Sequence, residues 1–189
     1  PYDPHGVAVV HESMVALNQI IVNSMIKAGA NPYAVAPAMF TTGHKVIAAK
    51  VKQLHEMAKK SNVIPVTFGD VVHMGGRKYS ILSGDALMSI IAKVLKPSRV
   101  IFATNVDGIY RDMQTKEIIK ELKPGRGGGG DPVEFSKTAG ADVTGGMQRK
   151  VREAFKIASM GMDVVLVNGL YPERIAQAAQ GKVQTGTVV

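Results

Sequence analysis

Two glycine-containing turns constrain the fold of this chain more than any other feature. Residues 100–104 form a short apolar run that predicts a buried strand, and a polar turn with the sequence NVDGIY follows it. Residues 142–150 (DVTGGMQRK) place two glycines directly before a predicted helix. Glycines in that position leave backbone N–H groups free to bind an anion, and the helix dipole favours negative charge there. Lys150 lies four residues after Gly146, so we expect its ammonium group to reach back over the same anion.

A third turn, at residues 83–85 (SGD), opens a predicted helix with Ser83 as its N-cap. Each of the three turns could by itself be an ordinary turn or a capped helix start. In an open parallel sheet, however, such turns gather at one edge, where ligands bind. As a set they therefore favour a polyphosphate site and phosphoryl transfer. The predicted site residues are Gly84 at one phosphate, Gly146 and Lys150 at the other end, and Asn105 and Asp107 on the nucleotide, directly or through Mg²⁺.

Helical and strand-like segments alternate along the rest of the chain, which predicts an α/β fold with helices on both faces of a largely parallel sheet. A Gly75-Gly76 pair between two short apolar runs predicts a β-hairpin. The predicted helices cover residues 6–28, 44–60, 83–95, 147–160 and 172–179, and the predicted strands cover residues 63–68, 71–74, 77–82, 99–104, 164–167 and 186–189.

Composition narrows the possible functions. The chain has no cysteine, which excludes disulfides and thiolate metal sites and fits a cytoplasmic protein. No apolar run approaches the ~20 residues that span a membrane. The net charge is +8, but the basic residues are spread out and do not interleave with aromatic ones, so we expect no nucleic-acid partner. The five histidines lack metal-ligand spacing, so no metal site is predicted.

The order of the three motifs resembles the amino acid kinase superfamily, and the resemblance covers nearly the whole chain. It is carried by residues 83–85, 103–110 (ATNVDGIY) and 142–147 with Lys150. Within the superfamily, residues 11–18 (HESMVALN) and 186–189 (GTVV) resemble the archaeal type of isopentenyl phosphate kinase. The run of four glycines at residues 127–130 is not a feature of that family.

The resemblance implies an αβα sandwich, a homodimer, ATP with Mg²⁺ as the phosphoryl donor, and a small-molecule phosphate as the acceptor. By the family pattern, Gly84 lies at the acceptor phosphate. Asn105, Gly146 and Lys150 lie at ATP, and Asn105 stands where family members usually carry aspartate.

The beginning of the chain departs from the family pattern. Family members open with a strand, a glycine loop with lysines and a second glycine-rich turn that carries a catalytic histidine, and none of these precedes Pro1. We therefore expect a single domain over residues 1–189 that lacks its first strands. The catalytic histidine would lie upstream of Pro1, because neither His5 nor His11 matches its motif.

Three functions remain open on the sequence. The first is ATP-dependent phosphorylation of isopentenyl phosphate to the diphosphate, the second is the same fold acting on uridylate or an amino acid carboxylate, and the third is a non-catalytic nucleotide-binding module. An alkyl acceptor needs an apolar pocket, and one wall of it could come from the first helix, although the same stripe could simply pack in the core. The stripe comprises Val10, Met14, Leu17, Ile21, Met25 and Ala28.

Overall fold

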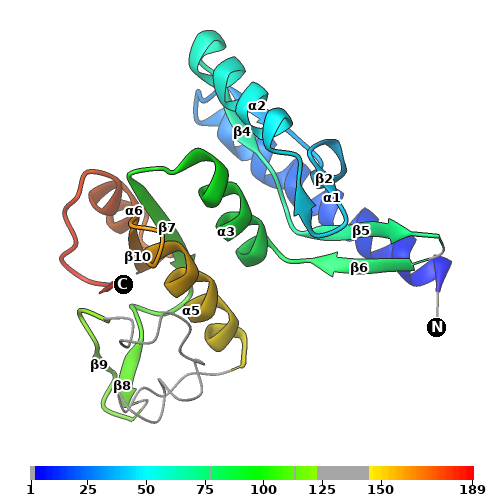
Figure 1. Ribbon diagram of the computed structural model, residues 1–189. Helices are drawn as coiled ribbons and strands as arrows, with labels where there is room; N and C mark the ends of the chain where they lie inside the picture. The colour runs from blue at the N-terminus through cyan, green and yellow to red at the C-terminus, as the bar shows by residue number, and fades with distance from the viewer. Residues whose placement is uncertain (1–2, 77, 113, 123–144) are drawn as a thin grey trace. The chain divides into compact units, whose positions relative to one another are not determined.

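The computed structural model describes residues 3–76, 78–112, 114–122 and 145–189. The chain divides into two compact units, Pro1–Leu95 and Lys96–Val189 (Figure 1). The single domain expected over residues 1–189 stays a prediction. The glycine run at residues 127–130 and the start of the predicted anion turn, residues 142–144, lie outside the described residues.

The first unit combines helices with three pairs of short strands. Strands β1 and β4 pair in parallel, whereas β2 with β3 and β5 with β6 pair antiparallel. Its helices are α1 (Pro4–Lys27), the 3-10 helix η1 (Pro37–Met39), α2 (Ala48–Ser61) and α3 (Gly84–Leu95). Its strands are β1 (Pro32–Ala34), β2 (Thr41–Thr42), β3 (Lys45–Val46), β4 (Ile64–Val66), β5 (Asp70–Gly75) and β6 (Lys78–Leu82).

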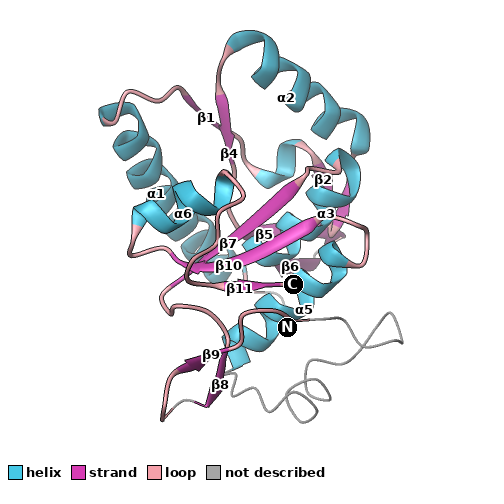
Figure 2. Ribbon diagram, turned by 90° about the vertical axis from the view of Figure 1, so that its left-hand side faces the viewer, coloured by secondary structure: helices cyan, strands magenta, loops and turns pink. Residues whose placement is uncertain are grey.

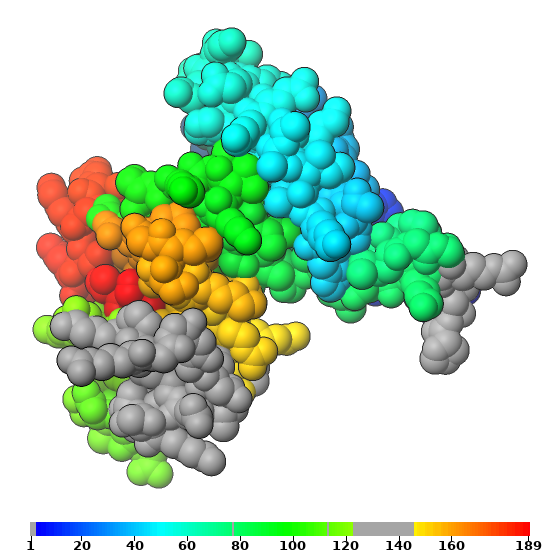
Figure 3. All heavy atoms as spheres, viewed as in Figure 1, coloured from blue at the N-terminus to red at the C-terminus, as the bar shows by residue number. Residues whose placement is uncertain are grey.

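The core of the first unit lies between α2, α3 and the β5–β6 hairpin. Its buried members are Val35, Phe40, Val51, Val72, Leu82 and Leu87. The predicted hairpin is confirmed, and both Gly75 and Gly76 adopt the positive φ angles that such a turn needs. Helix α2 begins four residues later than expected, because residues 41–46 form the short hairpin β2–β3 instead. Much of the surface of α2 is exposed (Figure 3, cyan).

The buried face of α1 differs from the predicted stripe. The Asp3 side chain caps the helix by accepting from the His5 backbone N–H, and Val22 and Asn18 are buried in its middle. Leu17 and Ile21, which we expected inside, are 48% and 44% exposed. Packing in the core is therefore wrong for these two residues, whereas a place in the wall of an acceptor pocket stays a prediction. Apolar residues occur almost all round this helix, so their spacing alone could not select the buried face.

Among its described residues, the second unit is built on a three-stranded sheet in the order β11–β10–β7 (Figure 2). Strand β10 pairs in parallel with β7 and antiparallel with β11, which confirms the predicted final edge strand. After β7 the chain forms the short antiparallel hairpin β8–β9. The elements are β7 (Arg99–Thr104), β8 (Tyr110–Asp112), β9 (Glu117–Ile118), α5 (Gly145–Ala158), β10 (Asp163–Asn168), α6 (Pro172–Ala179) and β11 (Thr187–Val188).

Helices cover both faces of this sheet. Side chains alternate between the faces of a strand, so Val165 and Val167 of β10 point to one face and Val164 and Leu166 to the other. Helix α6 packs on the first face through Ala178, and α5 contacts β10 and β7 from the second. All four side chains are buried. The αβα layering predicted from the sequence is thus confirmed within this unit.

We predict that Leu166→Ala lowers the free energy of unfolding by about 2–5 kcal/mol, because it removes methyl groups from a site with no exposure and leaves a cavity. The matched control is Leu170→Ala, since Leu170 is 72% exposed just after the same strand. Urea unfolding of both variants measures the difference. Equal losses in the two variants would contradict the assigned burial.

Candidate functional site

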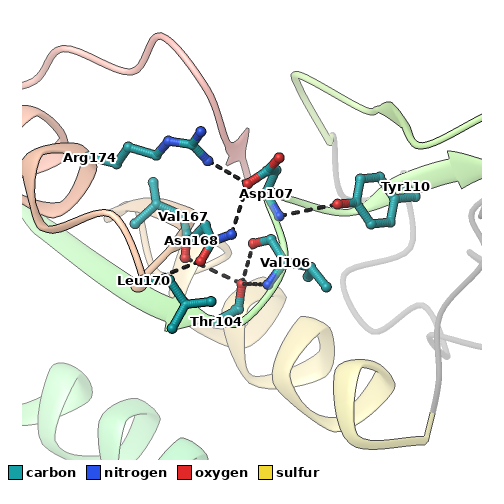
Figure 4. Close-up of polar contacts among 8 residues, drawn as sticks. All are labelled: Thr104, Val106, Asp107, Tyr110, Val167, Asn168, Leu170 and Arg174. Carbon is teal, nitrogen blue, oxygen red and sulfur yellow. Dashed lines mark hydrogen bonds and ion pairs between the residues drawn. The ribbon is translucent and has the colours of Figure 1, made fainter.

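The turn after β7 is held in shape by the last residue of that strand. The Thr104 hydroxyl donates to the Val106 carbonyl oxygen at 2.7 Å and accepts from the Val106 N–H at 3.3 Å. It also lies 3.3 Å from the carbonyl oxygen of Val167 in β10 (Figure 4). One side chain therefore fixes the local turn and ties it to the neighbouring strand.

Asp107, a predicted nucleotide contact, anchors this turn to two other elements. Its Oδ1 accepts from the Asn168 side-chain amide at 2.8 Å and from the Arg174 guanidinium of α6 (Figure 4). The Asn168 hydrogen bond, followed by that of Arg174, holds the pKa of the Asp107 carboxyl below its ordinary value of 3.8. Arg174 in turn lies over the Tyr171 ring, 4.1 Å from its centroid.

Gly108 allows the opposite side of the turn to pack closely. A Cβ at this position would lie 2.8 Å from Thr187 Oγ1 and 2.9 Å from Ile118 Cγ2, so only glycine fits. The same Thr187 hydroxyl accepts from the Ile109 N–H and donates to the Ile119 carbonyl oxygen. With both flanks fixed, Asn105 is the exposed residue at the tip of the turn.

Two further predicted residues lie on α5 in the same unit. Gly146 is in the first turn of this helix, where backbone N–H groups have no intrahelical acceptor, and a Cβ there would meet no described heavy atom within 4 Å. Lys150 is one turn further along, and its Nζ lies 5.5 Å from the centre of the Phe102 ring of β7. The surface over Gly146 is therefore open to a ligand on the described side.

The fifth predicted residue, Gly84, belongs to the first unit. It starts α3, and the expected N-cap is confirmed, because the Ser83 hydroxyl accepts from the Ala86 N–H at 3.2 Å. A Cβ at Gly84 would also meet no described atom within 4 Å. Convergence of Gly84 with Gly146 and Lys150 stays a prediction.

Sequence reasoning missed the side chains that organise these turns. Asn168 stands at the carboxyl end of a predicted strand, and that position could have indicated it. The sequence holds no comparable signal for Arg174. His11 is exposed, and its hydrogen bond to Asp70, a buried carboxylate that is distant in sequence, was also missed.

The described residues contain no group of three histidine or acidic side chains that could hold a metal ion. The Oδ1 atom of Asp107 already accepts hydrogen bonds from Asn168 and Arg174. In the described part of the chain, no helix is long and apolar enough to cross a membrane.

Comparison with known protein families shows which family the chain belongs to. The model of the amino acid kinase family matches residues 2–168, which is most of the chain. This chain belongs to the amino acid kinase family. The resemblance inferred from the three motifs is thereby confirmed.

Several similar relatives are isopentenyl phosphate kinases. The isopentenyl phosphate kinase of Methanothermobacter thermautotrophicus is 30% identical over 186 residues, covering 96% of this chain and 70% of the relative. That of Thermoplasma acidophilum is 28% identical over 195 residues, covering 100% and 74%. A crystal structure of an isopentenyl phosphate kinase substrate complex superposes with a TM-score of 0.73 at 25% identity, covering 100% of this chain and 73% of that chain. The predicted amino acid kinase fold is confirmed by this match.

We predict that Asp107→Asn is less stable than the unaltered protein at neutral pH and that the difference narrows in acid. The folded state favours the ionised carboxyl more than the unfolded chain does. Its stabilisation is therefore present above about pH 5 and is lost as the pH falls through the lowered pKa. Urea unfolding between pH 7 and pH 3 measures this, with the exposed Glu173→Gln as control. A difference that stays constant with pH would contradict the assignment.

Proposed function

We propose that this chain catalyses the ATP-dependent phosphorylation of isopentenyl phosphate to isopentenyl diphosphate. The observation that carries the proposal is similarity to isopentenyl phosphate kinases over 96% or more of the chain, in sequence and in fold. The chain is accordingly a small-molecule kinase whose acceptor is itself a phosphate. One bond breaks, between the γ-phosphorus of ATP and its bridging oxygen, and one forms to an oxygen of the acceptor phosphate, so ADP leaves.

The second unit holds ATP in this proposal. The N–H groups in the first turn of α5, including that of Gly146, bind phosphate oxygens, and Lys150 neutralises their charge. Asn105 contacts the nucleotide from the tip of the turn after β7. Asp107 supports that contact mainly by fixing the turn, since its Oδ1 already accepts from Asn168 and Arg174.

Gly84 holds the acceptor phosphate in the first unit. Ser83 caps α3, so the first N–H groups of this helix can bind an anion, and the position over Gly84 is clear of described protein atoms. The side chain of any larger residue would occupy the space where the phosphate approaches.

Mg²⁺ enters the proposal only as the companion of ATP. The described residues offer no cluster of carboxylates to cage it, and Mg²⁺ in kinases is held largely by phosphate oxygens. We likewise propose a homodimer, from the family resemblance, and a cytoplasmic location, which the absence of cysteine fits. Light scattering of the purified protein measures the oligomeric state.

We predict that the complete gene product turns over isopentenyl phosphate with kcat/KM at least about a hundredfold above that for UMP or glutamate. Such a gap corresponds to about 2.7 kcal/mol of transition-state discrimination. A coupled assay of ADP release with the three acceptors measures it. A preference for UMP would contradict isopentenyl phosphate as the acceptor and favour uridylate instead. Nucleotide binding with no turnover of any acceptor would favour a non-catalytic nucleotide-binding module.

We predict that Lys150→Ala lowers kcat/KM for ATP by about 10²–10³, because one charge on the transferring phosphates is lost. The matched control is Lys156→Ala, which removes a lysine of the same helix that pairs with Glu153 at 2.7 Å. Steady-state kinetics with varied ATP measures both variants. Equal effects of the two substitutions would exclude a specific role for Lys150.

A further inference from the structure

A histidine–carboxylate pair in the first unit has no part in the function proposed so far. The Nδ1 atom of His11, near the start of α1, lies 2.8 Å from Oδ2 of Asp70, the first residue of β5. The Asp70 side chain is 4% exposed, whereas that of His11 is 52% exposed. The pair therefore joins a helix to a strand 59 residues away.

Both oxygens of this buried carboxylate are bonded. The Val71 backbone N–H donates to Oδ1 at 2.7 Å, and His11 supplies the partner for Oδ2. An ionised carboxylate only accepts hydrogen bonds, so the proton of the pair lies on His11 Nδ1. Burial of a carboxylate is costly unless it is paired, and loss of its partner leaves an uncompensated charge. Asp70 thus holds its place through α1.

The residue before Asp70 touches the turn assigned to the acceptor phosphate. A Cβ at Gly69 would lie 2.7 Å from the backbone nitrogen of Gly84 and 3.1 Å from the carbonyl oxygen of Leu82. Asp70 is also the register partner of Leu82 across the hairpin. The backbone at residues 69–70 therefore lies directly against the backbone that leads into α3.

We propose that His11 and Asp70 are positioning residues for the acceptor-phosphate turn. The pair fixes the start of β5, Gly69 transmits that position by backbone contact, and the N–H of Gly84 is thereby aimed at the phosphate. This inference rests on the proposed role of Gly84 as acceptor site. It adds two residues that contact no substrate and act on the affinity for the acceptor rather than for ATP.

The first test removes the hydrogen-bond donor of His11 to Asp70 in one variant and restores a donor in a second variant. In His11→Leu the KM for isopentenyl phosphate rises about tenfold while the KM for ATP stays within about twofold, because a displaced turn loses hydrogen-bond geometry to one substrate only. His11→Asn places an amide N–H near the position of Nδ1 and restores most of the acceptor affinity. The matched control is His55→Leu, on the exposed surface of α2. A purely structural pair would instead lower the unfolding midpoint and leave both KM values unchanged, which would overturn the proposal.

The second test reaches the same contact without altering the pair. Gly69→Ala forces a methyl group against the Gly84 nitrogen, so the KM for the acceptor rises as in His11→Leu. If His11→Leu does not fold, His11→Asn and Gly69→Ala decide the question. A Gly69→Ala variant with unchanged acceptor KM would overturn the proposal.

A third measurement is independent of turnover. The backbone amide signal of Gly84 is followed by NMR while inorganic phosphate is titrated into the complete gene product. We expect His11→Leu to shift that signal before phosphate is added and to weaken phosphate binding about tenfold. An unchanged Gly84 signal with unchanged phosphate affinity would refute positioning. Absence of isopentenyl phosphate turnover in the unaltered protein, with the Gly84 effects intact, would refute only the proposed function.

Discussion

The parallel ladder between β7 and β10 aligns Thr104 with Asn168, so the two strands end side by side at one edge of the sheet. The turns that follow them are brought together by this register. Thr104 can reach Val167, and Asn168 can reach Asp107, only because the last residues of both strands are level. A slip by one residue would also exchange the two faces of β10, which is buried on both sides.

An ion pair and a buried amide hold the turn after β7 in place. Asp107 carries a full negative charge beside the end of the sheet, and Arg174 balances it from α6. Asn168 is buried and uses both ends of its amide, since its oxygen accepts from the Leu170 N–H while its nitrogen donates to Asp107. A buried amide with both ends satisfied is rigid. The turn thus presents Asn105 from a fixed base.

The sequence indicated the elements better than the contacts between them. The strand at residues 99–104 and the cap at Ser83 follow from local patterns, namely a short apolar run and a small polar residue before a helix. The face of α1 that is buried, and the pairing of His11 with Asp70, depend on which distant segments meet. Local spacing carries no such information, so the sequence did not indicate that the exposed His11 is the partner of a buried carboxylate.

Gly108 and Asn105 differ in how much change each can accept. Gly108 is enclosed by Thr187 and Ile118, so every side chain at that position collides with packed atoms. Asn105, three residues earlier, faces solvent. A saturation library at the proposed nucleotide contact should therefore randomise position 105 and keep position 108 constant, because diversity at 108 would mainly yield misfolded clones.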